Sequence, residues 1–287
     1  MDIYRLKLFI NTVKHLKLKQ IYYQLFYRFR NRFFKNNYQK ELNNEPQPLE
    51  WKDLIYCQNS FKKKNVFTFL NIKHEFIEDI NWNYSSYGKL WSYNLNYFDF
   101  LNQCDILSKD GLGLIKDYIE KDSLLLDGKE PYPTSLRGIN WIKFLSKNNI
   151  SESVINQSLY NHYQRLLHSL EYHLLGNHLL ENGFSLLFGA YYFKDEVLYK
   201  KAKKLLKAEL NEQILKDGAH YELSPMYHQI LFFRLLDCIN LLKLNPWKQD
   251  DLFVFLEKKA EKMFTWLFAI TFRNGNIPMV NDSTYNI

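Results

Sequence analysis

Apolar residues recur at helical spacing along almost the whole chain after Leu90. In one segment after another they occupy positions i, i+3, i+4 and i+7, the pattern of a helix with one buried face. Short turns rich in Gly, Asn, Asp or Pro separate these segments, and no convincing strand pattern follows Leu90. We therefore expect an all-α fold of antiparallel helical hairpins wound into a bundle, solenoid or ring. The expected helices cover residues 113–126, 136–148, 154–175, 181–193, 197–215, 227–244 and 251–270.

The first 90 residues show two other patterns. Residues 1–40 combine apolar residues near helical spacing with many basic residues, and predict a basic amphipathic arm. Residues 41–89 are more polar and predict a linker with a short irregular or β segment, because residues 65–76 alternate as a β-hairpin does. The main helical domain is then expected over residues 90–287.

The charge is concentrated in the arm. The chain has a formal net charge of +7, but residues 1–40 hold ten Lys or Arg against one acidic residue, so the other 247 residues are slightly acidic. No nucleic-acid recognition signature accompanies the basic residues, and we expect no nucleic-acid partner. Two interpretations remain for residues 1–35: contact with an anionic membrane surface, or packing of the arm on its own domain.

Other features of the composition exclude several classes of protein. The three cysteines, Cys57, Cys104 and Cys238, lie far apart without a CxxC pair, so neither a zinc site nor a disulfide scaffold is expected. Phosphate-binding glycine loops and the GxSxG elbow of hydrolases are absent, and no metal or cofactor is expected. The sequence begins without a secretory signal pattern, which favours a cytoplasmic or membrane-peripheral location. Aromatic residues make up 17% of the chain, enough to fill a core or to line a carbohydrate groove.

One polar cluster interrupts a very apolar stretch in "LLGNHLLENG", residues 174–183. Gly176 is suited to ending one helix, and Asn177 to capping the next. His178, Glu181 and Asn182 follow at positions i, i+3 and i+4, so they share one helical face. Such a face is either solvated or directed at a cavity, and the apolar residues around it favour the cavity.

A second cluster lies in "DGAHYELSPMYHQ", residues 217–229. Ser224 and Pro225 read as the N-cap and first residue of a helix, so Tyr227 would lie in the first turn, where the helix dipole helps lower a phenol pKa. Alternatively, Tyr227 only packs. Farther along the chain, Asn281 and Asp282 follow a Pro turn.

A third polar segment is "PYPTSLRGINW", residues 131–141. It holds Arg137 and Asn140, three positions apart, which together could bind a carboxylate. Both residues could equally well solvate the start of a helix.

Taken together, several segments resemble the heparinase II/III-like polysaccharide lyases. They cover most of the chain in order and are residues 15–30, 90–100, 131–141, 176–183, 210–237 and 271–283. The resemblance implies an incomplete (α/α) toroid that cleaves an acidic, uronic-acid-containing polysaccharide by β-elimination. It also implies a C-terminal β-sandwich that this chain is expected to lack, as a truncated product, an excised toroid or the N-terminal half of a split gene. A separate sandwich is then the expected partner.

The resemblance also implies roles for the clustered residues. Asn177 would neutralise the uronate carboxylate, and His178 would be the base or its helper. Tyr227 would be the general acid, and in the alternative assignment it would also be the base. The expected substrate-binding residues are Arg137, Asn140, Glu181, Asn182, Glu222 and His228. Two alternatives stay open: a non-catalytic module for carbohydrate binding or exopolysaccharide assembly, and a glycosidase that uses Glu181 and Glu222 as its carboxylate pair.

Overall fold

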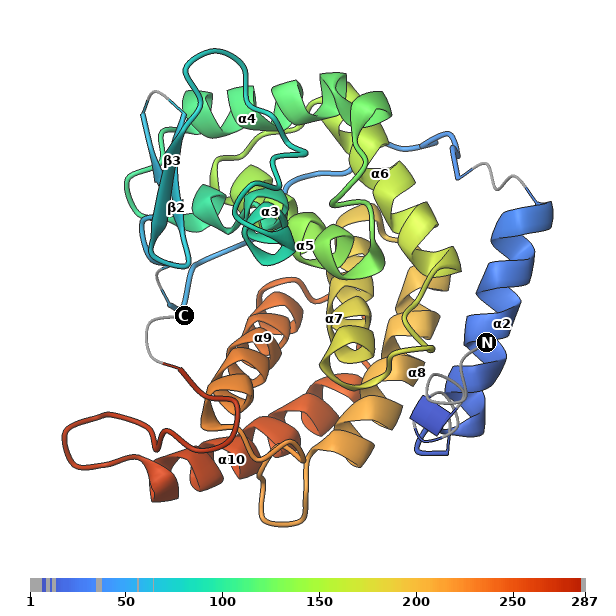
Figure 1. Cartoon of the computed structure of the whole chain (residues 1–287), viewed down its shortest axis with the longest axis vertical. Helices are drawn as coiled ribbons and strands as arrows, with labels where there is room; N and C mark the ends of the chain where they lie inside the picture. Colours follow the sequence, from blue (N-terminus) through green and yellow to red (C-terminus); the bar gives the residue numbers. More distant parts are fainter. Residues whose placement is uncertain are drawn as a thin grey trace.

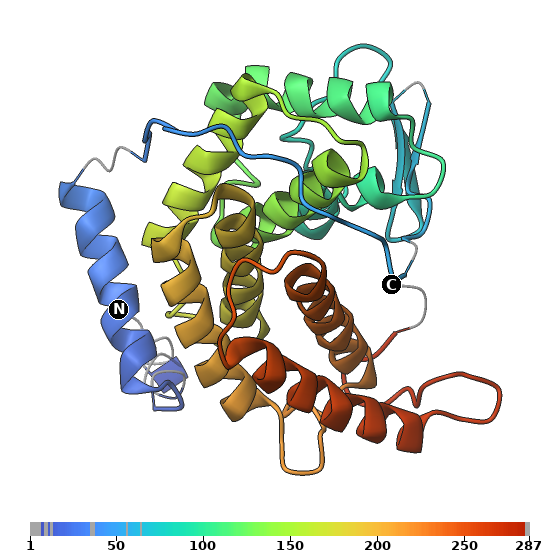
Figure 2. The same ribbon diagram turned by 180° about the vertical axis from the view of Figure 1, so that it is seen from behind.

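A computed structural model shows an all-α architecture of helical hairpins curved into part of a ring, with a small sheet at one edge (Figures 1 and 2). It describes residues 7, 8, 11, 14–34, 38–55, 57–63 and 65–284. The expected helical class and incomplete toroid are confirmed. None of the helices in these ranges is both long and apolar enough to cross a membrane.

From α3 onward the helices follow one another with short connections, whereas the small sheet lies between α2 and α3. They are α2 (Leu18–Phe33), α3 (Lys89–Tyr97), α4 (Ser108–Glu120), α5 (Pro131–Lys147), α6 (Ser153–His168), α7 (Gly176–Phe193), α8 (Glu196–Gln213), α9 (Pro225–Leu244) and α10 (Leu252–Ile270). Short 3₁₀ turns, Asp99–Asn102 and Asp122–Leu124, precede and follow α4.

Local sequence explains where several helices begin. Proline occupies the start of α5 and of α9, where the missing N–H is not needed. Asp195 caps α8 by accepting hydrogen bonds from the N–H groups of Val197 and Leu198. Ser224 caps α9 by accepting from the Tyr227 N–H, as expected from the sequence.

Helix α7 forms the centre of the domain. It packs against α5, α6, α8 and α9, and its residues from Leu179 to Tyr192 are all buried. Close approach to its neighbours depends on glycine: a Cβ on Gly189 would lie 2.6 Å from the ring of Tyr163 on α6. A continuous apolar core surrounds α7, and the first turn of this helix carries part of the candidate site.

The only sheet within the described ranges is small and antiparallel. It has the order β1 (Phe61–Lys62), β2 (Val66–Phe69) and β3 (Ile72–Glu75). Phe67 pairs with His74 across the β2–β3 hairpin, which confirms the hairpin expected over residues 65–76. Phe67 and Phe69 pack against Phe100, so the sheet covers the edge of the helical core.

Candidate active site

The chain between α6 and α7 departs from the expected helix. The apolar pattern predicted a helix through residue 175, but α6 ends at His168 and residues 169–175 form turns. Gly176 has the expected positive φ of 59°, yet it begins α7 and does not end the preceding helix. Asn177 is therefore not the cap: Leu175 occupies the N-cap position, and its side chain makes no cap hydrogen bond.

Leu175 adopts a backbone conformation that side chains disfavour, with φ 63° and ψ −155°. This region is used almost only by glycine, and strain of this kind concentrates at functional sites. Leu223, just before the cap of α9, also has a positive φ, of 53°. The two helices that carry the predicted catalytic residues thus both follow a strained leucine.

Gly176 brings the first two polar clusters together. A Cβ at this position would lie 2.9 Å from the Tyr221 hydroxyl and 3.7 Å from Oε1 of Glu222. Gln213 at the end of α8 donates a hydrogen bond of 2.9 Å to the Gly176 carbonyl. The start of α7 therefore touches the segment leading to α9, and both helices begin at the same end of the domain (Figure 1).

His178 is oriented by a carboxylate that the sequence analysis missed. Its Nδ1 lies 3.1 Å from Oε1 of Glu171, in the turn segment before α7. Asn182 donates to Oε2 of Glu171 at 2.9 Å, and its oxygen accepts from the Glu171 N–H at 2.8 Å. Asn182 is buried, so it supports the histidine through Glu171 and is not presented to a substrate as predicted.

The surroundings of His178 leave part of the ring accessible. Its side chain is 38% exposed, whereas that of Glu171 is 5% exposed. The ring of Tyr132, from the start of α5, lies 4.5 Å from the His178 ring centroid. Burial, reinforced by the negative charge of Glu181, raises the pKa of Tyr132 well above its ordinary value, so this phenol stays neutral beside the imidazole.

Tyr227 lies in the first turn of α9 as predicted, but its pKa moves in the opposite direction from the one expected. Its hydroxyl lies 3.5 Å from Oδ2 of Asp282. Partial burial, followed by the charges of Asp282 and Glu222, raises the pKa of Tyr227 above its ordinary value. These effects favour the protonated phenol, which can donate a proton.

Glu222 interacts electrostatically both with His178 on α7 and with the Tyr227–Asp282 pair. Burial and the charge of Asp282 raise its pKa, while the nearby His178 acts in the opposite direction. Beside it, burial and the Glu222 charge raise the pKa of Tyr221 to about 12. His178, Glu222, Tyr227 and Asp282 thus lie in one electrostatic neighbourhood, which we call the α7–α9 cluster together with Gly176, Asn177 and Tyr221.

The predicted carboxylate clamp of Arg137 and Asn140 is not formed. Arg137 is fully buried and donates to the backbone carbonyls of Asn96 and Gly128 at 3.1 and 2.9 Å. Asn140 is buried as well and donates to the Tyr97 carbonyl at 2.9 Å and to Asp99 at 2.5 Å. Both residues hold the connections around α3 against α5, so they brace the fold and do not meet at a ligand.

Glu181 is also removed from the surface. It is buried, and Oε2 lies 3.3 Å from Nε of Arg234. Arg234 lies 3.5 Å from Asp237, which in turn pairs with Lys143 at 3.0 Å. This buried ion network joins α5, α7 and α9 and leaves Glu181 unsuited to the glycosidase pair with the exposed Glu222.

His228 has both ring nitrogens occupied inside the protein. Nδ1 accepts a hydrogen bond of 3.2 Å from the His220 N–H, so Nε2 carries the proton and donates to the Met263 carbonyl at 3.0 Å. Burial lowers the pKa of His228 to about 4. The predicted substrate-binding role is therefore wrong: His228 is a neutral tie between the start of α9 and α10.

The loop after α10 completes the α7–α9 cluster. Asn281 donates to the Leu223 carbonyl at 2.7 Å, and the cap residue Ser224 donates to the Asp282 carbonyl at 3.1 Å. These bonds bring Asp282 beside Tyr227. The sequence analysis noted Asn281 and Asp282 only as part of a loop.

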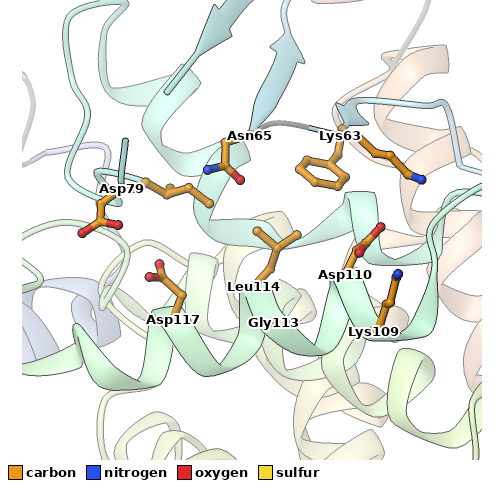
Figure 3. Close-up of a pocket in the computed structure, with 10 residues that line it drawn as sticks. Lys63, Asn65, Asp79, Lys109, Asp110, Gly113, Leu114 and Asp117 are labelled. Carbon is orange, nitrogen blue, oxygen red and sulfur yellow. The ribbon is translucent and has the colours of Figure 1, made fainter. Parts of the chain in front are cut away.

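A separate pocket of about 550 Å³ lies between the sheet and α4 (Figure 3). Asp79 and Asp117 line one end, and Lys63, Lys109 and Asp110 the other. Asp117 is committed to structure, because it accepts from Trp82 Nε1 at 2.7 Å and pairs with Lys121 at 2.8 Å. The pocket contains none of the predicted site residues. No group of three or more potential metal ligands occurs among the described residues.

Comparisons with known proteins agree with the fold. The chain is 25% identical over 145 residues to a heparin-sulfate lyase of Bacteroides stercoris, an alignment that covers 49% of this chain and 22% of that protein. A heparan sulfate lyase HepC mutant from Pedobacter heparinus superposes with a TM-score of 0.53 and 19% identity, over 75% of this chain and 38% of the other. A heparinase III gene product gives a TM-score of 0.52 and 20% identity, over 77% and 41% of the two chains.

The chain therefore spans about a fifth of the curated relative and about two fifths of the solved structures. Residues 134–286, more than half of the chain, match the family described as Heparinase II/III N-terminus. This range includes Glu171, Asn177, His178, Tyr227 and Asp282. The chain belongs to the heparinase II/III family, whose N-terminal part it matches.

Proposed function

We propose that this chain carries the catalytic residues of a polysaccharide lyase that cleaves a uronic-acid-containing glycan by β-elimination. The observation that carries the proposal is the α7–α9 cluster, in which a carboxylate-oriented histidine shares an electrostatic neighbourhood with a protonated tyrosine. The relationship to a heparin-sulfate lyase supports an acidic glycosaminoglycan as the class of substrate.

The first requirement of the reaction is to acidify the proton on C5 of the uronate. A carboxylate withdraws electrons from C5 effectively only when its negative charge is offset. In the proposal, the Asn177 amide donates to this carboxylate. Its position in the first turn of α7 supports this role, because unpaired N–H groups and the positive end of the dipole favour an anion there.

The second requirement is a base. With Nδ1–H donating to Glu171, the neutral His178 ring has a lone pair on Nε2, and this atom would take the C5 proton. Glu171 would stabilise the imidazolium that forms. The ring is partly exposed, which is consistent with access to a substrate.

The third requirement is a proton for the departing oxygen. Tyr227 would donate its phenolic proton as the C4–O bond breaks and the C4=C5 double bond forms. The raised pKa of Tyr227 keeps it protonated at neutral pH, which fits an acid better than a base. His178 then loses its proton to solvent and Tyr227 regains one, so the site returns to its starting state.

The remaining exposed groups suit recognition of the sugar. Tyr221 and Glu222 lie beside Gly176, and both remain accessible. Glu222 would accept hydrogen bonds from sugar hydroxyls.

The test is to incubate the protein with heparan sulfate, chondroitin and alginate and to follow the ultraviolet absorbance of the unsaturated uronate. We expect absorbance to rise with at least one polysaccharide, and Asn177→Ala to suppress the rise. New saturated chain ends without absorbance would identify a hydrolase. Binding without any cleavage would favour the non-catalytic carbohydrate module.

A further inference from the structure

Helix α2 presents different chemistry on its two sides. One side is docked on the helical domain: the Tyr23 ring stacks on Tyr172 with centroids 4.5 Å apart, and the Tyr27 hydroxyl donates to the Leu170 carbonyl at 2.7 Å. Arg30 donates to the His168 carbonyl, and Gln20 to that of Leu174 at 3.1 Å. The helix therefore lies along the outside of the domain in a fixed orientation (Figures 1 and 2).

The opposite side is a row of large apolar residues in solvent. These residues are between 41% (Phe26) and 85% (Leu18) exposed, although a soluble surface rarely gathers so many. Their spacing confines them to about 100° of the helix circumference at 3.6 residues per turn. The row, which we call the α2 stripe, consists of Leu18, Tyr22, Leu25, Phe26, Phe29 and Phe33.

Basic residues border the α2 stripe on both edges. At 3.6 residues per turn, Arg28 and Arg32 project along one edge. Lys19 and Arg30 lie along the other edge, where Lys19 covers the Tyr172 ring and Arg30 bonds to the His168 carbonyl. The helix contains no acidic residue, and no ion pair involves Arg28 or Arg32 within the described part of the chain. An apolar row bordered by basic residues is the arrangement of helices that lie in the surface of an anionic bilayer. Long basic side chains, here those of Arg28 and Arg32, reach the headgroups while the row enters the acyl region.

We propose that the α2 stripe docks the protein on an anionic lipid membrane. The leucines and phenylalanines favour a bilayer over a glycan as the occupant, because they offer no hydrogen bonds to sugar hydroxyls. The docked side of α2 remains on the domain in this arrangement, so binding requires no unfolding of the helix.

The experiment is flotation of the full chain with phosphatidylcholine vesicles, with and without phosphatidylglycerol. We expect binding to the vesicles that contain phosphatidylglycerol, and weaker binding as salt is added. Leu25→Gln/Phe29→Gln removes two apolar anchors without changing charge, and should weaken binding about tenfold or more. The matched control is Phe264→Gln/Phe268→Gln on α10, which removes two exposed phenylalanines from another surface and should bind like the wild type.

The charged edge has its own matched pair of variants. Arg28→Gln/Arg32→Gln should weaken binding about fivefold per charge removed. Lys258→Gln/Lys262→Gln, at the same spacing on α10, should leave it unchanged. Unfolding midpoints equal to that of the wild type would show that the variants keep the fold.

Three results would overturn the proposal: no binding of the wild type to phosphatidylglycerol vesicles, equal losses in the α2 and α10 variants, or full binding by Leu25→Gln/Phe29→Gln. Capture of soluble heparan sulfate by the α2 stripe, without vesicle binding, would assign the surface to a glycan instead.

Discussion

Oε1 of Glu171 lies 3.1 Å from Nδ1 of His178, while the other carboxylate oxygen accepts a hydrogen bond from Asn182. The Asn182 amide therefore holds the Glu171 carboxylate in place, and the carboxylate in turn orients the His178 ring. A histidine held in this way presents Nε2 with a defined tautomer, which a proton-abstracting group needs.

Glu171→Gln should lower the lyase kcat about 100-fold, because the neutral amide can no longer stabilise the imidazolium or fix its tautomer. Steady-state kinetics on a cleaved polysaccharide would measure the change, with KM little affected. Asp250→Asn removes another partly buried carboxylate, one that pairs with Lys203 on α8, and serves as the control with unchanged kcat. Wild-type kcat in Glu171→Gln would remove Glu171 from the mechanism.

Gly176→Ala should destabilise the protein by about 1–2 kcal/mol, because a side chain disfavours the positive φ and the new methyl would lie 2.9 Å from the Tyr221 hydroxyl. Gly113→Ala is the matched control: it lies inside α4 with open space around it, and should stabilise by up to about 1 kcal/mol. Denaturant unfolding of the three proteins measures both values. Equal effects of the two substitutions would contradict the described start of α7.

Asp282→Asn should move the alkaline limb of the lyase pH–rate profile to lower pH. The Asp282 charge helps to raise the pKa of Tyr227, so its removal lets the phenol ionise earlier, and an ionised phenol cannot act as the acid. The control is Glu257→Gln, which removes the negative charge of an exposed residue on α10 and should leave the alkaline limb unchanged. An alkaline limb that does not respond to Asp282→Asn would argue against Tyr227 as the proton donor.

His228 should make the fold sensitive to acid. The pKa of His228 is about 4 in the folded protein, below the ordinary value of 6.5. Between these two pH values the unfolded chain therefore binds a proton at this residue more readily than the folded protein does. Its contribution to stability is complete above about pH 6.5, and about 2 kcal/mol is lost between about pH 7 and pH 5. The loss continues as the pH falls through about 4.

His228→Gln should reduce the loss of stability in acid. Because the hydrogen bonds of His228 to His220 and Met263 are broken, the substitution should also lower the free energy of unfolding at neutral pH by about 1–3 kcal/mol. Denaturant unfolding at the two pH values measures both effects. The exposed His15→Gln is the control and should change neither. An unaltered acid response in His228→Gln would show that another group controls it.

Much of the helical framework could be predicted from periodicity, because the buried faces of α5 to α10 leave a clear pattern. Residues 169–175 could not, since their apolar spacing continues that of α6 while their turns depend on contacts from elsewhere. The Glu171 N–H, for example, bonds to Asn182, eleven residues later. The predicted helix therefore extended too far and included Glu171, so the role of this carboxylate in orienting His178 was not predicted.

The predictions for individual polar residues show the same limit. A residue type and its spacing do not reveal which partner a buried side chain finds. Arg137 is bonded to two backbone carbonyls, and His228 has both ring nitrogens paired, which no local pattern indicates. Asp282 joins Tyr227 only because the last loop folds back onto the cap of α9.

The most direct test separates the base from the acid. His178→Ala and Tyr227→Phe would be assayed on a natural uronic-acid polysaccharide and on a synthetic uronide whose leaving group is a strongly acidic phenol. We predict that both substitutions lower kcat/KM on the natural polysaccharide about 100-fold or more. Only Tyr227→Phe should regain activity on the synthetic uronide, because the acidic phenol of that substrate leaves without receiving a proton. The assigned roles would be contradicted if His178→Ala regained activity on the synthetic uronide, or if the two variants were equally active on each of the two substrates.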